Sequence, residues 1–495
     1  MKISPILFAV ILAAPLTAQS RPGDIQLDTS GTTTAFGPAI ASSDLVSVAV
    51  WNSDDTVMCA TSTDGGNTWN APIAIGGGSG SGAKRTYKDA IAIDADRIYV
   101  AYEDEATGSE EHMFTVSGDK GATWSTPVQL TTLKSGDIYD INLVADNGTV
   151  VVTSMSDSFP QGCYAHISND GGATWTASRL DAGTGDIDEI DTCMSGNDIL
   201  VTWNDDTTGA NAVYAAVSND AGATFGAVTQ VSGTGTVRAQ DHDCYTENGD
   251  MVVAWLQDDT SISGTAEDVV AAYSSDSGAT WGTPVNVTTT GLNGGDCDNL
   301  EVYHSQLNAG TGGMTNFVFE NNPNGSDEVF CVSSDDYLAT PGIETNLGAG
   351  GFPRVVGERS YVGVAFTGPG FPENPMLAVS RDGGFTFGTG AMDMSDGAST
   401  GDADFVEVGY DARYDNFVVV YLEDRLGSNN VWACGTRAAY FDHTISGGTI
   451  TFNAERFGLQ AVPSDVQMVA AFNNNPSGVA LPADGRNIML AFDPI

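Results

Sequence analysis

The sequence predicts an all-β protein, an eight-bladed β-propeller of four-stranded units, with seven blades as the alternative. Three observations support this prediction. An octapeptide recurs at intervals of about 50 residues, the length of one four-stranded blade. A short run of β-branched and aromatic residues precedes each copy. Glycine, which tight turns favour, makes up 59 of the 495 residues.

The composition narrows the class of protein. The chain carries 64 acidic against 18 basic residues, a formal net charge of −46, and 41% of its residues are hydrophobic. This negative charge argues against nucleic acid and anionic membranes as partners, because both would be repelled at long range. The hydrophobic residues fall in regular short runs, which argues against disorder. The values fit a soluble, acidic protein of a salty or calcium-containing medium.

The first 20 residues have the pattern of a secretory signal peptide. Lys2 precedes an apolar run from Ile6 to Leu16, and Leu-Thr-Ala at 16–18 resembles a cleavage site. The run is too short to span a bilayer, and no later segment is apolar over the length that a membrane helix needs. We therefore expect residues 1–20 to be removed. The mature chain is expected to be secreted or periplasmic, without a transmembrane segment.

Seven cysteines remain after the signal peptide, an odd number for an oxidising compartment. They are Cys59, Cys163, Cys193, Cys244, Cys297, Cys331 and Cys434. None shows C-x-x-C spacing, which argues against a zinc site. Three disulfides at most can form among seven cysteines of one chain. The sequence does not give their pairing.

The recurring octapeptide has the pattern S-x-D-x-G-x-T-W, with phenylalanine in place of tryptophan in two copies. Six good copies and one degenerate copy occur, which begin at Ser62, Ser117, Ser168, Ser218, Ser274, Ser380 and, for the degenerate copy, Ser333. The degenerate copy lacks the glycine and the aromatic residue. In such a segment the polar oxygens can bond turn backbone groups, and glycine can take a positive φ. The aromatic ring can pack beneath the turn.

This pattern resembles the Asp box, or bacterial neuraminidase (BNR) repeat, of sialidase-like β-propellers. The copies and their strands extend from about residue 35 to residue 440. The resemblance implies that each box is a structural hairpin between the third and fourth strands of a blade. It also places the boxes on the face away from the catalytic centre, so the boxes indicate the fold and not a reaction.

Eight β-branched or aromatic runs are expected to form the second strands, one more than the number of boxes. They are Leu45–Trp51, Arg97–Tyr102, Thr149–Thr153, Ile199–Trp203, Met251–Trp255, Asn316–Phe319, Tyr361–Phe366 and Phe417–Tyr421. The eighth unit has no box, and we expect a strand at 25–27 to complete it and remove the exposed edge. The prediction is one large domain over residues 21–455, with 456–495 as a C-terminal extension that packs on it.

Most of the second-strand runs end in an aromatic residue. These residues are Trp51, Tyr102, Trp203, Trp255, Phe319, Phe366 and Tyr421. They could stack on sugars, but their fixed phase within apolar runs favours a place in the core between blades.

A second repeat lies where the innermost strand of each blade is expected to begin, on the face where propellers usually bind ligands. Arg354 takes one position of this repeat, and six aspartates take the others, namely Asp89, Asp140, Asp191, Asp243, Asp298 and Asp404. If the six carboxylates lie at the same depth along the channel, they converge on its axis. Their mutual repulsion then requires a cation, basic side chains or backbone donors nearby. The column therefore predicts a Ca²⁺ site, because this cation prefers oxygen ligands. The alternative is that each aspartate accepts backbone N–H groups of the neighbouring connection.

Further candidates for ligand contact lie beside the same strand starts. They are Arg85, Arg238, Arg354, Tyr87, Tyr139 and His242. The arginines could hold an anionic sugar through paired hydrogen bonds, or they could neutralise the aspartates. The tyrosines could stack on a sugar. The histidine, which lies between two aspartates, could be the base of a lyase or an ion-pair partner.

The resemblance implies sialidase activity only where the functional residues of that family are present. Those sialidases hold the substrate carboxylate with three arginines, the first in a Phe/Tyr-Arg-Ile-Pro motif on the inner strand of the first blade. The matching segment, Phe36 to Ile40, has no arginine. No family motif places the nucleophilic tyrosine or the acid/base aspartate. We therefore expect a secreted, non-catalytic propeller that binds a glycan or an extracellular protein. The alternative is a glycoside hydrolase or polysaccharide lyase acting on an anionic glycan.

Overall fold

The computed structural model divides the chain into two units, residues 24–438 and a second unit with residues 1–23 and 439–495. The residues that the structure describes are 24–28, 34–77, 84–85, 89–105, 110–130, 138–156, 161–181, 185–207, 209, 211–233, 238–258, 267–288, 295–305, 314–323, 325–340, 342–388, 390–395, 401–414, 416–436, 442–446 and 449–453. In the second unit, the described residues form the hairpin of β34 (Asp442–Ser446) and β35 (Thr449–Asn453). The predicted signal peptide and the predicted extension 456–495 lie outside the described residues.

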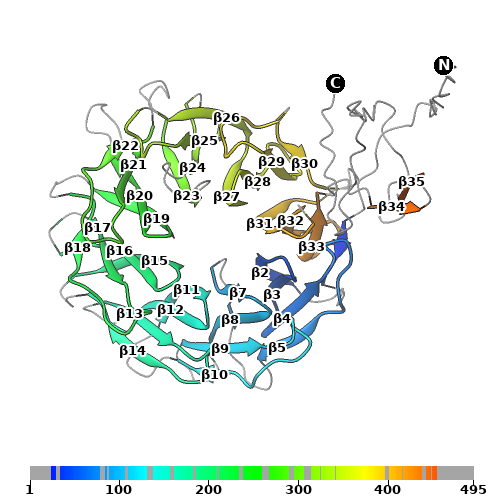
Figure 1. Ribbon diagram of the computed structural model, residues 1–495, viewed down its shortest axis with the longest axis horizontal. Helices are drawn as coiled ribbons and strands as arrows, with labels where there is room; N and C mark the ends of the chain where they lie inside the picture. The colour runs from blue at the N-terminus through cyan, green and yellow to red at the C-terminus, as the bar shows by residue number, and fades with distance from the viewer. Residues whose placement is uncertain are drawn as a thin grey trace, which may run out of the picture. The chain divides into compact units, whose positions relative to one another are not determined.

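Residues 24–438 form a ring of eight antiparallel sheets (Figure 1), which confirms the predicted eight-bladed β-propeller. Blade 1 contains β2 (Ala35–Ser42), β3 (Ser47–Ser53), β4 (Thr56–Ser62) and β5 (Ile73–Gly77), and blade 2 contains β6 (Lys84–Arg85), β7 (Ile91–Asp94), β8 (Arg97–Asp104), β9 (Glu111–Ser117) and β10 (Val128–Gln129). Blade 3 contains β11 (Ile138–Asp146), β12 (Thr149–Ser156), β13 (Gly162–Ser168) and β14 (Thr176–Arg179). Blade 4 contains β15 (Ile187–Ser195), β16 (Asp198–Asp205), β17 (Ala212–Ser218) and β18 (Thr229–Gln230).

Blades 5 to 8 repeat the same order, except that the fourth strand of blade 8 comes from the start of the unit. Blade 5 contains β19 (Ala239–Glu247), β20 (Asp250–Asp258), β21 (Glu267–Ser274) and β22 (Val285–Asn286), and blade 6 contains β23 (Cys297–Ser305), β24 (Met314–Asn321), β25 (Glu328–Ser334) and β26 (Ile343–Ala349). Blade 7 contains β27 (Gly351–Glu358), β28 (Tyr361–Thr367), β29 (Pro375–Ser380) and β30 (Met392–Asp393). Blade 8 contains β31 (Ala403–Asp411), β32 (Asn416–Glu423), β33 (Asn430–Gly435) and β1 (Ile25–Gln26). Among the described residues no helix is of a length and apolarity that could cross a membrane.

The ring closes through β1, as predicted. Ile25 pairs with Ala433 on β33, and the backbone N–H of Leu27 donates to Val431 O at 2.8 Å. The closing segment also carries Asp24, whose carboxylate lies 2.8 Å from Nη2 of Arg425. Blade 8 therefore combines strands from both ends of the unit, which leaves β33 without an open edge.

The boxes fold as the resemblance implies, in the turn between the third and fourth strands. In the third box, Ser168 Oγ accepts the Gly172 N–H at 2.8 Å, and Asp170 accepts the N–H and the hydroxyl of Thr174. These hydrogen bonds lower the pKa of the Asp170 carboxyl to about 2. Gly172 has φ +89°, and a Cβ there would lie 2.4 Å from the ring of Phe114. The box glycine is thus required both by its backbone conformation and by close packing.

The degenerate box begins one residue later than predicted. Ser334 Oγ, and not that of Ser333, accepts the Leu338 N–H at 2.9 Å, and Asp336 accepts the Thr340 hydroxyl at 2.6 Å. Two adjacent serines and two adjacent aspartates allow either register at those positions. The box threonine decides between them, because Thr340 falls at its position only if the box begins at Ser334. Leu338 takes the glycine position with φ +57°.

The hydrophobic core lies between adjacent blades, in eight clusters around the ring. Each of the eight predicted second-strand runs falls in a strand, although the strand of the first begins at Ser47 and not at Leu45. The aromatic residues that end seven of them are at most 1% exposed. The prediction that these rings belong to the core is confirmed. Because the core between blades uses them, they are not available as sugar platforms.

Candidate functional site

Each of the seven continuous inner strands has a one-residue register shift near its start, the mark of a β-bulge. Five residues at these bulges are Asp140, Asp241, Asn299, Phe352 and Phe405, with φ between 45° and 53°. Residues other than glycine rarely adopt this backbone conformation, and it concentrates at functional sites. The starts of the inner strands are therefore one strained part of the fold, on the face opposite the boxes.

Each bulge adds one residue to the inner strand and so changes which inner-strand residues lie at the same depth, or level, along the central channel. Five inner-strand residues share one level, because each pairs with the second-strand residue just before a buried aromatic side chain. They are Asp191, Asp243, Glu301, Arg354 and Glu407. The expectation that six aspartates share one level is therefore wrong.

The other predicted aspartates lie outside this level. Asp298 and Asp404 come before the bulges, opposite Glu320 and Leu422, and are exposed. Asp140 lies within the bulge of β11. Asp89 immediately precedes Ala90, a buried residue of blade 2. Because glutamates occupy the level in blades 6 and 8, a search for a repeated aspartate gave the wrong register there.

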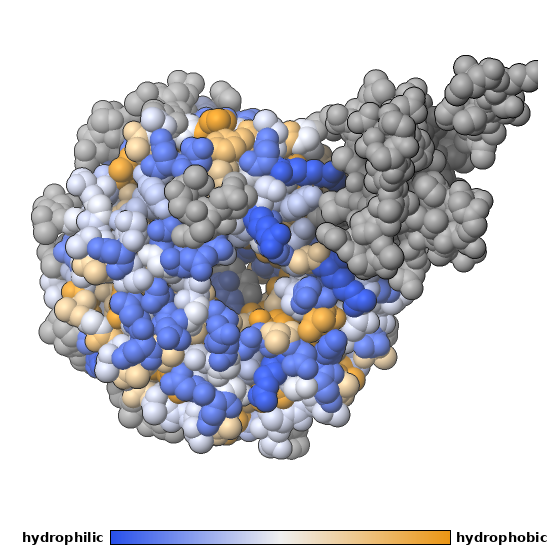
Figure 2. All heavy atoms as spheres, viewed as in Figure 1, coloured by the Kyte–Doolittle hydropathy of each residue, from blue (hydrophilic) through white to orange (hydrophobic). Residues whose placement is uncertain are grey.

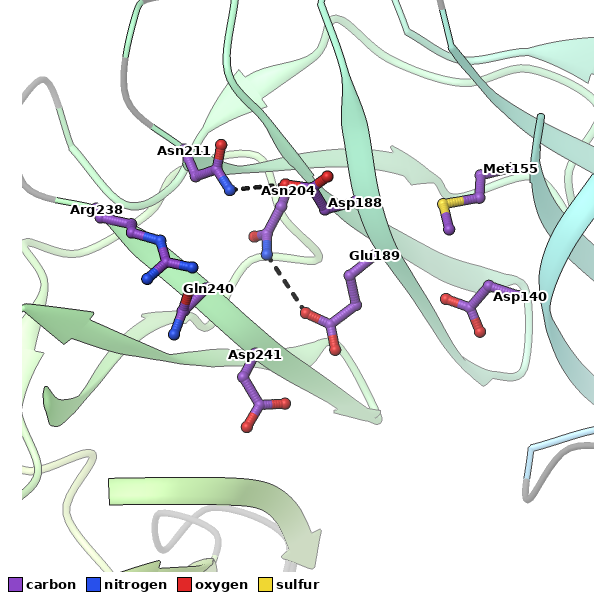
Figure 3. A pocket seen from close by; sticks show the side chains of 9 residues that line it. All are labelled: Asp140, Met155, Asp188, Glu189, Asn204, Asn211, Arg238, Gln240 and Asp241. Atoms are coloured by element: carbon purple, nitrogen blue, oxygen red, sulfur yellow. Dashed lines mark hydrogen bonds between the residues drawn. The ribbon is translucent and has the colours of Figure 1, made fainter. Parts of the chain in front are cut away.

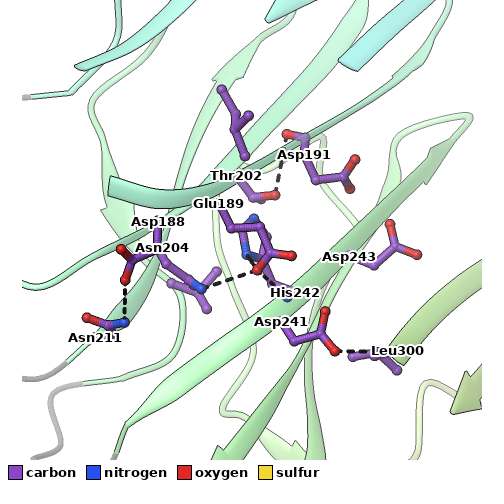
Figure 4. A network of polar contacts seen from close by, with 12 residues as sticks. Asp188, Glu189, Asp191, Thr202, Asn204, Asn211, Asp241, His242, Asp243 and Leu300 are labelled. Atoms are coloured by element: carbon purple, nitrogen blue, oxygen red, sulfur yellow. Dashed lines mark hydrogen bonds and ion pairs between the residues drawn. The ribbon is translucent and has the colours of Figure 1, made fainter. Parts of the chain in front are cut away.

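Four inner-strand carboxylates accept backbone N–H groups from the next blade, and Figure 4 shows one of these contacts, between Asp241 and Leu300. Asp191 Oδ2 accepts the Cys244 N–H at 2.7 Å, and Asp243 Oδ2 accepts the Val302 N–H at 2.5 Å. The bulge carboxylates of Asp140 and Asp241 do the same for N–H groups of blades 4 and 6, at 3.1 and 3.3 Å. This is the alternative that the sequence left open, and it gives these four carboxylates a structural role.

Arg354 lies between two glutamates of the same level. Its Nε is 3.0 Å from Glu407 Oε1, and its Nη1 is 3.2 Å from Glu301 Oε1. The three side chains are between 10% and 20% exposed. Burial lowers the pKa of the guanidinium, but the two glutamates raise it by more, so the arginine stays charged. Both carboxylate partners belong to the protein, which neutralises the cation that the sequence offered for ligand binding.

His242 is buried in the wall between blades 4 and 5. Its side chain is fully buried, and Nδ1 lies 3.2 Å from Glu189 Oε2 (Figure 4). Burial lowers the pKa of His242, whereas the carboxylates of Glu189 and Asp191 raise it, with a net shift upward. The arrangement is that of an ion-pair partner, the second of the two roles that the sequence allowed.

A pocket of about 610 Å³ opens on this face over blades 3 to 5 (Figure 3). The residues that line it are Asp140, Met155, Asp188, Glu189, Asn204, Asn211, Arg238, Gln240 and Asp241. The pocket brings the predicted residues Asp140 and Arg238 together. Four carboxylates, three carboxamides and a single guanidinium face one opening.

The amide groups in the pocket are arranged in pairs with the carboxylates. Asn211 Nδ2 donates to Asp188 Oδ2 at 2.7 Å, and Asn204 Nδ2 donates to Glu189 Oε2 at 3.3 Å (Figure 3). Asn204 is 2% exposed, and its Oδ1 accepts no hydrogen bond from the described residues. A buried amide oxygen without a donor is costly, so this atom marks a place where a bound group with an O–H or N–H would be stabilised.

A different surface lies on the same face at blades 7 and 8. Its exposed apolar side chains are Phe352, Phe371, Phe405 and Leu426, which are between 56% and 89% exposed. The segment that carries Phe371 is hydrogen-bonded to blade 8, because the Ala403 N–H donates to Glu373 O at 3.0 Å. Figure 2 shows one face of the ring, largely hydrophilic and hollowed at the centre.

The remaining predicted site residues are only partly described. Arg85 belongs to β6, which pairs with β8, and Tyr139 belongs to β11, but their side chains are not among the described parts. Tyr87 lies outside the described residues. Within the described part of the chain, no three His, Cys, Asp or Glu side chains converge closely enough to hold a metal ion.

Sequence reasoning missed the side chains that complete the pocket, and it missed Glu301 and Glu407 at the level of Arg354. Asp188 and Glu189 sit on the bulge of β15, and Asn204 and Asn211 flank the connection after β16. No repeat marks these residues, because each occurs in one blade only. The acidic pair at 188–189, at the phase of the other strand starts, was the one available signal.

Comparison with known proteins supports the repeat assignment. Residues 52–285 match the family model described as a BNR repeat-like domain. No curated protein matches the chain. Similar solved structures include an ulvan lyase described as a new family of polysaccharide lyase, PL25, with 11% identity over 84% of this chain and 95% of that one, at a TM-score of 0.45.

Two other solved structures have a comparable level of similarity. The polysaccharide lyase Uly1 has 8% identity over 70% of this chain and 89% of its own, at a TM-score of 0.48. The sialidase of Trypanosoma rangeli has 13% identity over 85% and 60%, at a TM-score of 0.38. Likeness at this level carries no inference about what this chain binds or does. The repeated boxes and the matched family model identify a BNR repeat-like domain over residues 52–285, within a ring of eight propeller blades.

Proposed function

We propose that the propeller binds carbohydrate without carboxylate or sulfate groups, in the pocket over blades 3 to 5, and leaves it intact. The observation that carries the proposal is the polar lining of that pocket. Sugar hydroxyls donate and accept hydrogen bonds at once, and adjacent carboxylate and carboxamide groups complement both functions. The Asp188–Asn211 pair presents such an array at the opening.

Asn204 supports a bound hydroxyl more directly. Its Oδ1 is buried and has no donor among the described residues, although its Nδ2 is engaged by Glu189. A ligand O–H that donates to this oxygen would remove a desolvation penalty of about 1–3 kcal/mol. This gives the pocket a preference for a polyhydroxylated ligand over an apolar one. The exposed phenylalanines of blades 7 and 8 offer further flat surfaces to a long chain.

The charge of the face favours a neutral sugar. Four carboxylates and one arginine line the pocket, so an anionic sugar would meet net repulsion. Arg354, the other arginine with a described side chain at the strand starts, already binds Glu301 and Glu407. Partial burial of its carboxyl raises the pKa of Asp404, and the neighbouring carboxylates of Asp402 and Asp424 raise it further, so acidic groups also lie close together elsewhere on the face.

Binding without cleavage fits the position of the histidine. A lyase needs a base that reaches the sugar ring, and the His242 side chain is fully buried against Glu189. The alternative is a hydrolase, which needs two carboxylates on either side of the scissile bond. This alternative predicts shortened oligosaccharides after incubation, whereas the proposal predicts intact ones.

A binding assay with an Asp188→Ala variant tests the proposal. An array of neutral, uronate-containing and sulfated oligosaccharides should show retention of neutral members by the wild type. Asp188→Ala should weaken that binding about 10- to 100-fold, because a hydrogen bond to a charged group contributes about 1.5–3 kcal/mol. The matched control is Asn197→Ala, an exposed residue lining a second pocket among the turns on the box face. Equal losses in both variants, preference for anionic members, or shortened oligosaccharides would contradict the proposal.

Calcium at the inner-strand acids stays a prediction from the sequence, and melting curves test it. With the aspartates acting as acceptors for the next blade, we expect exhaustive chelation to leave the wild-type melting temperature unchanged. If Ca²⁺ binds, it stabilises the native state by about 2.7 kcal/mol at a hundredfold excess over Kd. A fall in melting temperature on chelation that is lost in an Asp191→Asn, Asp243→Asn double variant would establish the metal site.

A further inference from the structure

The seven cysteines are all described, all buried, and unevenly distributed among the cores between blades. Five cores hold one cysteine each, and these are Cys59, Cys163, Cys297, Cys331 and Cys434. The core between blades 4 and 5 holds two, Cys193 and Cys244. A bond between cysteines of different cores would have to pass through a sheet. The distribution therefore singles out one pair.

The two cysteines of this core face each other across the blade boundary. Cys193 lies on β15 and Cys244 on β19, and their Sγ atoms are in contact at 2.6 Å. The backbone holds them in register, because the Cys244 N–H donates to Asp191 Oδ2 at 2.7 Å. The two sulfurs are thus already close to the separation of about 2.05 Å that a disulfide bond requires.

We propose that Cys193 and Cys244 form a disulfide bond that joins blades 4 and 5. The two thiols give up two protons and two electrons to a small-molecule or enzyme disulfide, which is reduced to two thiols as the S–S bond forms. The other five cysteines remain thiols, which accounts for the odd number in the chain. The oxidising compartment that this step needs is the one predicted by the signal peptide.

The burial of the Cys193 and Cys244 thiols determines the stage of folding at which the disulfide bond forms. It raises the pKa of both thiols, so little thiolate is present once the core is closed. Exchange therefore takes place before β15 and β19 are fully packed, and the finished bond resists reduction in the folded protein. The same two strands supply Asp188, Glu189, Gln240 and Asp241 to the pocket, so the bond fixes the spacing of two of its walls.

Thiol counting tests the proposal on protein refolded in reduced and oxidised glutathione. After denaturation without reductant, the wild type should show five reactive thiols, its seven less the bonded pair, and seven after reduction. Cys193→Ser should show six in both states, because Cys244 loses its partner. The matched control Cys297→Ser, in the core between blades 5 and 6, should show four and then six. Seven thiols in the unreduced wild type would overturn the proposal.

Peptide mapping of the unreduced wild type identifies the pair without any variant. Cleavage after Arg and Glu isolates Cys193 in residues 190–238 and Cys244 in residues 239–247. These two peptides should appear linked, at the sum of their masses less two hydrogens, and should separate on reduction. A linked peptide that joins either cysteine to one of the other five would equally overturn the proposal.

Discussion

Replacement of Arg354 by alanine should lower the free energy of unfolding by about 3–5 kcal/mol. The substitution leaves Glu301 and Glu407 largely buried and without the cation that lies 3.2 and 3.0 Å from them. Removal of one partner from a buried ion pair has this cost because the remaining charge is uncompensated. Urea unfolding at neutral pH measures the loss.

The pH dependence of the Arg354 variant separates this mechanism from a simple loss of packing. Without the arginine the two glutamates repel each other, and protonation of either one relieves the repulsion. The destabilisation should therefore shrink in acid, where glutamate carboxyls become protonated. Arg238→Ala is the matched control, since that side chain is 54% exposed and its contact with Glu267 is 3.9 Å long. An Arg354→Ala protein of wild-type stability with impaired ligand binding would contradict the structural role and restore the ligand-binding one.

Replacement of Leu27 by alanine should lower the free energy of unfolding by about 2–5 kcal/mol. The loss of stability should be concentrated where blades 8 and 1 meet. Leu27 is 2% exposed and packs in the core between blades 8 and 1, directly after the closing strand. Its loss leaves a cavity and weakens the attachment of β1 to β33. Hydrogen exchange should then accelerate more at β33 than at β19, on the far side of the ring.

The control for this variant is Val128→Ala on the outermost strand β10, where the side chain is 46% exposed. It should change the free energy of unfolding by no more than about 0.5 kcal/mol. A uniform rise in exchange around the ring after Leu27→Ala would argue that closure is not a local event. The Leu27 variant should also associate at higher concentration, because an open β33 edge pairs with other chains.

The fold was predictable because its signals are local and repeated. An Asp box needs a serine, an aspartate and a glycine within five residues, and the contacts around Gly172 show that each is demanded by its own turn. The closing strand followed from counting, since the eighth unit lacked a fourth strand. The one error in the boxes, a shift by one residue at Ser334, occurred where glycine was replaced by Leu338.

The site was predicted less well because it depends on bulges and on residues that do not repeat. One extra residue at the start of an inner strand moves Asp298 and Asp404 off the level that Glu301 and Glu407 occupy, and spacing along the chain does not reveal it. The pocket depends on Asn204 and Asn211, which occur in a single blade. Physical pairing, such as that of Arg354 with two glutamates, requires the three-dimensional register and cannot be read from spacing.

The contacts between inner strands bear on how such rings change in number of blades. At the boundaries from blade 3 to blade 6, an inner-strand carboxylate of one blade accepts a backbone N–H of the next, as Asp191 does from Cys244 and Asp243 from Val302. A backbone donor is present in any sequence except at proline, so the contact makes no demand on the side chains of the blade that follows. A duplicated copy of blade 3, 4 or 5 would therefore carry its own acceptor for the blade that follows. Duplication of one of these blades can lengthen the ring, and deletion of one can shorten it, without paired substitutions at this contact.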